Sequence, residues 1–284
     1  NTLDGKGGAD VMFGYGGDDN YVVDDVGDVV REAAGEGYDT VRSTVSFSLE
    51  GEHIERLFLK GTAAINGTGN SLANKLFGND ASNTLDGKGG ADVMLGYGGD
   101  DNYVVDDVGD VVREAAGEGY DTVRSTVSFS LVGEHIERLI LKGNSAIDGT
   151  GNNLDNRIVG NSKANVLAGR GGDDEMTGGG GRDRFVFDFA LGADNIDTIT
   201  DFKVDVDTIV LSGQIFTAIG STLNGSEFRA NSTGLARDGN DHVIYDRTTG
   251  ALFYDPDGSG GQQAVQFARL SSGLALSHSD FDIV

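Results

Sequence analysis

The chain has 284 residues and a formal net charge of −25, from 46 acidic and 21 basic side chains. Of the acids, 35 are Asp and 11 are Glu, which speaks against a helical protein because Asp favours turns and caps. The negative charge would repel a polyanion, so nucleic acid is not expected as a partner. The lack of Cys excludes disulfides and thiolate metal sites, and no apolar run could span a bilayer.

Two long repeats occupy the first part of the chain. Residues 1–82 and 83–164 are copies of one 82-residue unit and differ at 14 positions, 12 of them between Phe58 and Ser82. A third copy begins at Asn165 and diverges at Phe185. The sequence thus divides into repeat unit 1 (1–82), repeat unit 2 (83–164) and a C-terminal part (165–284) that opens with a partial repeat block. Such fixed-period similarity predicts a stacked array.

A shorter period of nine residues runs through each unit, with Gly at position 1, Asn or Asp at position 6 and an apolar residue at position 8. An apolar column at this spacing fits neither a helix nor an ordinary hairpin. We expect a strand of about three residues around position 8, followed by a turn in which Gly supplies positive φ. Position 8 is Leu76, Leu85, Met94, Tyr103, Ile158, Leu167, Met176 and Phe185.

Two nine-residue periods should form one coil, so that turns 18 residues apart stack on the same side. A carboxylate and main-chain carbonyls from two stacked turns would surround one cation with about six oxygens, which suits Ca²⁺ rather than Zn²⁺ or Cu²⁺. A single Asp-Gly cluster would more simply be a solvated turn. Recurrence of the spacing in phase with an apolar column favours metal binding.

The same spacing predicts which side chains meet. Asp10, Asp19 and Asp28 are nine residues apart, and Asp39 follows after eleven because of a two-residue insertion. Four predicted pairs hold two carboxylates: Asp10 with Asp28, Asp19 with Asp39, Asp92 with Asp110, and Asp101 with Asp121. Four mixed pairs rank lower: Asn74 with Asp92, Asn83 with Asp101, Asn156 with Asp174, and Asn165 with Asp183. The uncharged Asn positions should bind more weakly or serve as structural coils.

The turn sequences GKGGAD, GYGGDD and GRGGDD resemble the Ca²⁺-binding nonapeptide of RTX proteins, although their second Gly stands at position 3 rather than 2. The resemblance implies an all-β, right-handed parallel β-roll that binds about six to eight Ca²⁺ ions. It also implies that the turn residues contribute to the metal sites: Gly5, Lys6, Gly7, Gly8, Gly14, Tyr15, Gly16, Gly17, Gly87, Gly89, Gly96, Gly98, Gly169, Gly171, Gly178 and Gly180.

Residues 40–59 alternate and are rich in β-branched side chains, which predicts extra strands that form a wider sheet. His53 and His135 lie in the sequence EHIER, which lacks the second His of a zinc-protease helix. We therefore expect a structural role for them on a strand. No HExxH, GxSxG or Cys nucleophile occurs, so we expect no enzyme in this segment, while a catalytic domain upstream of residue 1 stays open.

The C-terminal part resembles the closing β domain of serralysin-type proteins through FVF, DTITDF and YDPDGSG. That resemblance implies a β cap on the roll. VIYD and ALFYD flank RTTG and predict a hairpin. Asp255 and Asp257 stand in a loop that is similar to an EF-hand but has Gln266 in place of the bidentate Glu. This loop is either a Ca²⁺ site or a plain hairpin turn.

The last five residues, DFDIV, are similar to uncleaved signals of type I secretion. This implies a secreted, extracellular or cell-surface protein of a Gram-negative bacterium, with the type I secretion machinery as a partner. We expect a module that is unfolded in the low-calcium cytosol, folds on extracellular Ca²⁺ and forms the tail of a larger protein. The alternative is a calcium-dependent adhesin or polysaccharide-binding module, in which basic side chains face an acidic glycan: Arg42, Arg56, Arg124 and Arg138.

Overall fold

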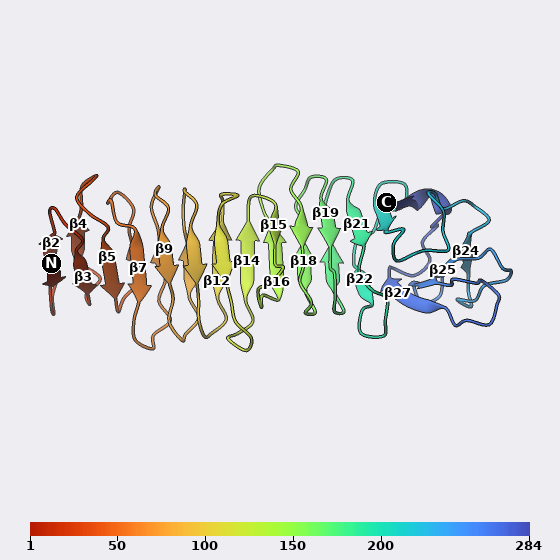
Figure 1. Cartoon of the computed structure of the whole chain (residues 1–284), viewed down its shortest axis with the longest axis horizontal. Coiled ribbons are helices and arrows are strands. Elements are labelled where there is room, and N and C mark those ends of the chain that lie inside the picture. The colour runs from red at the N-terminus through yellow and green to blue at the C-terminus, as the bar shows by residue number, and fades with distance from the viewer. The chain divides into compact units, whose positions relative to one another are not determined.

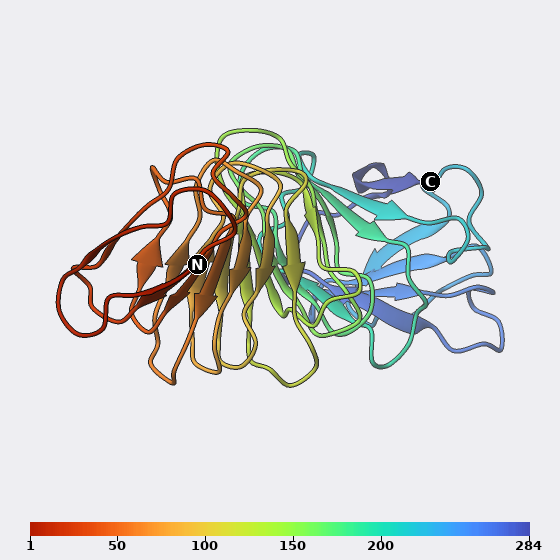
Figure 2. The same cartoon turned by 60° about the vertical axis from the view of Figure 1, so that its left-hand side comes forward.

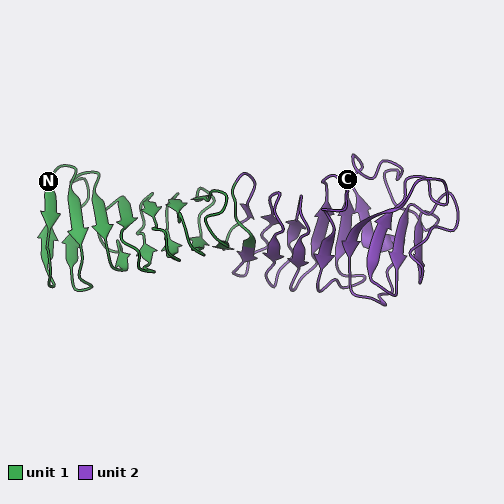
Figure 3. Cartoon of the chain, turned by 90° about the horizontal axis from the view of Figure 1, so that it is seen from below, with its two compact units in different colours: residues 1–127, 134–138 green, residues 128–133, 139–284 purple.

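The computed structural model describes residues 1–284, and it is all-β, with strands β1 to β28 and one short 3-10 helix at His278–Asp280. The chain forms two compact units, residues 1–127 with 134–138 and residues 128–133 with 139–284 (Figure 3). The division falls inside repeat unit 2. No helix has the length and apolar character that crossing a membrane requires.

The first unit is a parallel β-solenoid whose strands alternate between two sheets (Figures 1 and 2). One sheet has the order β1 (Thr2–Asp4), β3 (Asn20–Val23), β5 (Thr40–Ser43), β7 (Arg56–Leu59), β9 (Lys75–Phe77), β11 (Val93–Leu95) and β13 (Val111–Arg113). The other contains β6 (Phe47–Ser48), β8 (Gly67–Thr68), β10 (Thr84–Asp86), β12 (Asn102–Val105) and β14 (Thr122–Ser125). A separate pair is formed by β2 (Val11–Phe13) and β4 (Val29–Arg31).

The strand register confirms that two nine-residue periods make one coil. Leu85 is the partner of Tyr103, 18 residues later, and Met94 is the partner of Val112. At the two-residue insertion the offset becomes 20, because Tyr103 is the partner of Val123. The insertion is accommodated in the turn, so the strands on either side stay in register.

The apolar column at position 8 forms the core, as predicted. All eight of its side chains are completely buried. In the first unit the two sheets meet closely at Gly67, where an added Cβ would lie 3.0 Å from Leu57 of one sheet and 3.3 Å from Leu85 of the other. This packing fixes the strands, and thereby the turns that precede them.

Successive repeats place the same sequence in opposite sheets. Repeat unit 1 contains nine strands, β1 to β9. Because this number is odd, β3 lies in the seven-stranded sheet, whereas its counterpart β12 lies in the other sheet of the first unit. The predicted face with four Arg residues is therefore divided, since Arg42 is on β5 and Arg124 is on β14.

The alternating segment 40–59 forms the expected extra strands, which join the two sheets as further coils. Strands β5 and β7 are direct neighbours in one sheet, and β6 between them belongs to the other. His53, in contrast, is not on a strand as we expected: it is exposed in the turn before β7, where its N–H donates to the carbonyl of Glu32. The alternation reflects short strands with one buried face, which every coil of a solenoid has.

The second unit also contains stacked parallel strands and ends in a mixed sheet. One of its sheets contains β15 (Phe129–Ser130), β17 (Gly149–Thr150), β19 (Val166–Ala168), β21 (Arg184–Phe187), β23 (Thr208–Leu211) and β28 (Phe281–Ile283). Its other strands are β16 (Arg138–Leu141), which starts at the unit boundary, β18 (Arg157–Val159), β20 (Glu175–Thr177), β22 (Asp197–Ile199), β24 (Phe228–Asn231), β25 (Val243–Asp246), β26 (Ala251–Tyr254) and β27 (Val265–Arg269).

The end of this unit is closed by antiparallel strands. The predicted hairpin is confirmed, because β25 pairs with β26 in antiparallel fashion, and β26 pairs in the same way with β27. Phe216 packs edge-on against Tyr254 and Phe267, with ring centroids 5.0 and 5.1 Å apart. Side chains that would otherwise be exposed at the last coil are thus covered.

Candidate metal sites

Turns of the type G-x-G-G-x-D share an unusual backbone. Their position 2 is left-handed although it is not Gly, which costs about 1 kcal/mol per residue, and their position 4 is a Gly with φ from 103° to 114°. The left-handed residues are Lys6, Tyr15, Lys88, Tyr97 and Arg170, with φ from 61° to 77°. The repeated strain shows that the turn path is imposed by the coils on either side.

All eight predicted pairs lie in contact, each through the same hydrogen bond. The backbone N–H of the earlier residue donates to a carboxylate oxygen of the later one. Two-carboxylate pairs have N···O distances of 3.0 Å (Asp10 to Asp28), 2.8 Å (Asp19 to Asp39), 2.9 Å (Asp92 to Asp110) and 2.8 Å (Asp101 to Asp121). Mixed pairs have 2.7 Å (Asn74 to Asp92), 2.6 Å (Asn83 to Asp101), 2.7 Å (Asn156 to Asp174) and 2.9 Å (Asn165 to Asp183).

The second oxygen of most of these carboxylates is buried and accepts no hydrogen bond from the protein. Such groups are rare in folded proteins, because burying an unpaired charge costs several kcal/mol. Seven Asp residues carry one: Asp19, Asp39, Asp92, Asp101, Asp121, Asp174 and Asp183. Oxygens that converge between stacked turns and lack donors are suited to a hard cation, so the residues present fit Ca²⁺.

Burial also opposes ionisation of these groups without a counter-charge. It raises the pKa of Asp92 and of Asp101 to about 7, and that of Asp121 to about 6. Burial and repulsion from Asp197 raise the pKa of Asp174, and burial raises the pKa of Asp197 although hydrogen bonds from Asp174 oppose the shift. Without a cation, these carboxyls therefore take up protons closer to neutral pH than an exposed Asp does.

Glycine at position 1 leaves room for the carboxylate. A Cβ added to Gly87 would collide with the carboxylate of Asp92, and one added to Gly96 would collide with Asp101 and Tyr103. The same collision recurs at Gly14, Gly169 and Gly178. Position 3 is different, because a Cβ on Gly7 or Gly89 meets nothing within 4 Å, and those on Gly16 and Gly98 meet nothing closer than 4.0 and 3.5 Å.

Asp28 and Asp110 differ from the other predicted ligands. Both oxygens of Asp28 are used, one by the N–H of Asp10 and the other by the N–H groups of Asp24 and Asp25. Burial raises its pKa, but the three hydrogen bonds outweigh burial and leave the pKa lowered. Asp110 is bonded in the same way. Each of these two carboxylates therefore stabilises the loop that directly precedes it by accepting its backbone N–H groups.

The Asn side chains at the turn positions also form hydrogen bonds with the protein itself. Asn74 accepts the N–H of Asn70 at 2.7 Å and donates to the carbonyl of Ile54 at 2.9 Å. Asn83 and Asn165 make the equivalent bonds to Asn79 and Asn161 and to the carbonyls of Ile65 and Ile147. This geometry favours the structural-coil alternative for the Asn turns.

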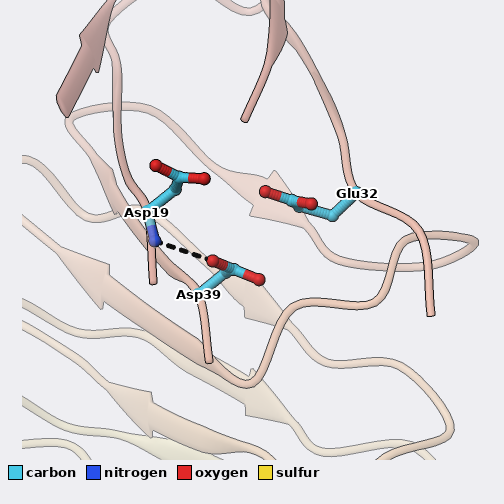
Figure 4. A group of neighbouring side chains, drawn as sticks. All are labelled: Asp19, Glu32 and Asp39. Atoms are coloured by element: carbon cyan, nitrogen blue, oxygen red, sulfur yellow. Dashed lines mark hydrogen bonds between the residues drawn. The ribbon is translucent and has the colours of Figure 1, made fainter. Parts of the chain in front are cut away.

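Two buried Glu residues that we did not predict join the Asp rows. Glu32 lies beside Asp19 and Asp39 (Figure 4), and Glu114 lies beside Asp101 and Asp121. In each group the nearest carboxylate oxygens lie within 4.8 Å of one another. The sequence does distinguish these two Glu residues. The residue directly after β2 and after β11 is a glycine, Gly14 and Gly96, whereas the residue directly after their neighbours β4 and β13 is Glu32 and Glu114.

Glu55 and Glu137 were also missed. Each is the last residue before a strand, β7 or β16. Asp39 and Asp121 occupy the same position before β5 and β14, the strands of the preceding coil. Glu55 accepts the N–H of Asp39 at 2.7 Å, and Glu137 accepts that of Asp121 at 2.8 Å. They follow Asp39 and Asp121 by 16 residues, which is not a multiple of nine, so the nine-residue period did not predict them.

The loop at Asp255 and Asp257 is stabilised from within. Asp255 accepts the N–H of Asp257 at 3.2 Å, and Asp257 accepts that of Gly261 at 2.9 Å. Burial raises the pKa of Asp255. The carboxylates lie close together, but Asp257 acts as the hydrogen-bond acceptor of a turn.

Comparison with protein families gives one match. Residues 1–30, 68–111 and 150–185 match the model of the RTX calcium-binding nonapeptide repeat (4 copies). No curated protein matches the chain. The matched segments contain the Asp rows at 10–28, 74–110 and 156–183, whereas Glu32, Asp39, Glu114 and Asp121 lie outside them.

Proposed function

Because this chain is an RTX β-roll protein with calcium-binding nonapeptide repeats, we propose that it is a module whose folding is switched on by calcium. In this proposal it stays unfolded in the low-calcium cytosol, leaves the cell by type I secretion and folds on extracellular Ca²⁺. It would serve there as the secretion and folding tail of a larger protein.

The row of seven buried Asp oxygens without a partner supports this proposal most directly. In the absence of a cation, folding would desolvate these charges and place them near one another, at a cost of several kcal/mol per ion. Ca²⁺ supplies the missing charge and accepts oxygen ligands in flexible geometry. The fold would therefore be unstable without the ion.

The energy available from binding is large enough for a switch. At about tenfold saturation, one site adds about 1.4 kcal/mol to the stability of the folded state. The six to eight sites that the resemblance implies would together add on the order of 10 kcal/mol, which matches the total stability of a typical domain. Extracellular-type sites have a Kd of about 10⁻⁴ to 10⁻³ M, so the contribution would nearly vanish in the cytosol.

Circular dichroism tests the switch. We expect the β signal and a cooperative urea transition in millimolar Ca²⁺, and a disordered spectrum in excess EGTA. Mg²⁺ at the same concentration is the control for ionic strength, and it should not restore the fold because it prefers smaller octahedral sites. Native β signal in EGTA would contradict the proposal.

The packing of residues 280–283 is compatible with export before folding. The terminal strand β28 pairs with β23, and its Phe281 is buried. Asp280 accepts the N–H of Asp205 at 2.9 Å. A signal in these residues would be readable only in the unfolded chain. Secretion that does not depend on a type I exporter, measured in a Gram-negative host with and without one, would refute this part.

A second candidate function, binding of an acidic polysaccharide, is favoured by one surface of β5, β7 and β9. Phe58 and Phe77 are stacked with centroids 4.2 Å apart. The charged groups of Arg42 and Lys60 lie 4.9 and 5.1 Å from the Phe58 ring centroid. Aromatic faces flanked by cations suit the ring and the carboxylate of an acidic sugar.

Repeat unit 2 shows which substitutions to make in a test of this candidate function, because it has Ile140 and Val159 where unit 1 has Phe58 and Phe77. Glycan-array binding in calcium should be lost on Phe58→Ile with Phe77→Val. Arg124→Ala, in the other sheet, should leave it intact. Absence of acidic-glycan binding by the natural sequence would eliminate this function.

A further inference from the structure

Three carboxylates converge in the coil that carries the two-residue insertion. Asp19 and Asp39 precede β3 and β5, and Glu32 reaches them from the end of β4 (Figure 4). Their relative exposures are 1%, 5% and 0% for Asp19, Glu32 and Asp39. Asp101, Glu114 and Asp121 repeat the arrangement, and all three are likewise buried.

Each carboxylate of the group has one oxygen held by a donor and one without any partner. In repeat unit 2, the held oxygens belong to Asp101, bonded by the N–H of Asn83, to Asp121, bonded by the N–H of Asp101, and to Glu114, bonded by the Tyr103 hydroxyl. The second oxygens, Oδ2 of Asp101, Oδ2 of Asp121 and Oε2 of Glu114, are buried and accept no hydrogen bond.

We propose that each group, Asp19 with Glu32 and Asp39 and Asp101 with Glu114 and Asp121, binds one Ca²⁺ through three carboxylates, and that these are the two tightest sites of the chain. The inference rests on the proposed calcium binding of the module and adds a ligand from outside the nonapeptide. Glu32 and Glu114 lie beyond the segments that match the family model.

The dimensions and the donors fit calcium. Two oxygens on one Ca²⁺ can be up to about 5 Å apart, because each Ca–O distance is about 2.3–2.6 Å, and the group spans at most 4.8 Å. All donors are hard oxygens, which disfavours Zn²⁺ and Cu²⁺. Burial disfavours Mg²⁺, which keeps several waters when it binds.

The charge of the group explains why we expect these two sites to bind Ca²⁺ more tightly than the others. Calcium affinity rises with the number of charged ligands. These groups offer three carboxylates, whereas a mixed Asn and Asp pair offers one, and both oxygens of Asp110 in the pair with Asp92 already accept backbone N–H groups. Tyr103 is the positioning residue, since its hydroxyl fixes one oxygen of Glu114.

The test uses the full chain and Glu114→Gln, which removes the charge but keeps the shape. Calorimetric titration with Ca²⁺ should show two tight equivalents in the natural sequence and one in the variant, with the lost site weakened at least tenfold, or about 1.4 kcal/mol. Asp107→Asn is the matched control, because Asp107 lies in the loop before β13 and its side chain bonds only the N–H of Gly109. Two tight equivalents in Glu114→Gln would overturn the proposal.

Terbium provides a second measurement if Glu114→Gln does not fold. The chain has eight Tyr and no Trp, so Tb³⁺ emission excited through tyrosine reports on ions near a phenol ring. Tyr103→Phe should lower the emission of the first two equivalents and keep a folded spectrum in calcium. Unchanged emission would place the tight ions elsewhere and refute the assignment. Failure of the natural sequence to bind any Ca²⁺ would instead refute the proposed function.

Discussion

Substitution of Gly96 by Ala tests whether the first glycine of the turn is needed for space. Its Cβ would collide with Oδ2 of Asp101 and with the hydroxyl of Tyr103. Neither group can move freely, because Asp101 is held by the N–H of Asn83 at 2.6 Å and Tyr103 is bonded to Glu114. The backbone of Gly96 has no positive φ, so the effect comes from the side chain alone.

The expected cost is at the upper end of the overpacking range. Forcing one methyl group into a packed site costs about 1–3 kcal/mol, and displacement of Asp101 would also break a hydrogen bond worth about 1 kcal/mol. We therefore expect Gly96→Ala to lower the free energy of unfolding in calcium by about 2–3 kcal/mol. The midpoint of calcium-induced folding should shift to higher concentration, because the displaced oxygen is a proposed ligand.

Gly89→Ala is the control, since the same substitution in an equivalent turn meets nothing within 4 Å. It should be neutral or raise stability by up to about 1 kcal/mol through lower entropy of the unfolded chain. Urea unfolding in saturating Ca²⁺ and a calcium titration followed by circular dichroism measure both variants. Equal behaviour of the two would refute the view that Gly96 makes room for the carboxylate.

Two further predictions follow from the carboxylates. Asp28→Asn with Asp110→Asn should leave the number of bound Ca²⁺ ions unchanged in a calorimetric titration, because both oxygens of each side chain are already used by backbone N–H groups. Loss of two ions would contradict this. In the absence of calcium, burial raises the pKa of Asp92 and Asp101 to about 7, so the folded state binds more protons than the unfolded state. Residual stability in EGTA should therefore be greatest below about pH 4 and fall as the pH rises to about 7, whereas calcium affinity should rise over the same range; urea midpoints that rise with pH in EGTA would refute the assignment.

The period of nine was sufficient to predict the coil and the contacts between turns. Tyr103 pairs with Leu85 because position 8 must be buried in every period, and this register brings Asp101 to Asp121 even across the insertion. Side chains that repeat with the core are thus placed by packing alone. For the same reason the hairpin of β25 and β26 was predictable from its turn residues.

The sequence could not show which oxygens remain free. Asp28 and Asp39 look alike in the repeat, but the path of residues 24–28 brings N–H groups to Asp28, and no such loop reaches Oδ2 of Asp39. Glu32 and Glu55 were missed because insertions move them out of phase with the period. Hydrogen-bond saturation depends on the loop path, which a spacing rule does not describe.

The odd number of strands in the 82-residue unit has a consequence for where a duplicated surface appears. Duplication of a unit with an even number of strands would extend a surface along one side, as a longer groove for a single ligand. Here each duplication copies the surface of β5 to the opposite sheet, at β14. Repetition therefore gives two different sheets the same strand sequence, TVRS on β5 and on β14, so that later substitutions can change one sheet without changing the other.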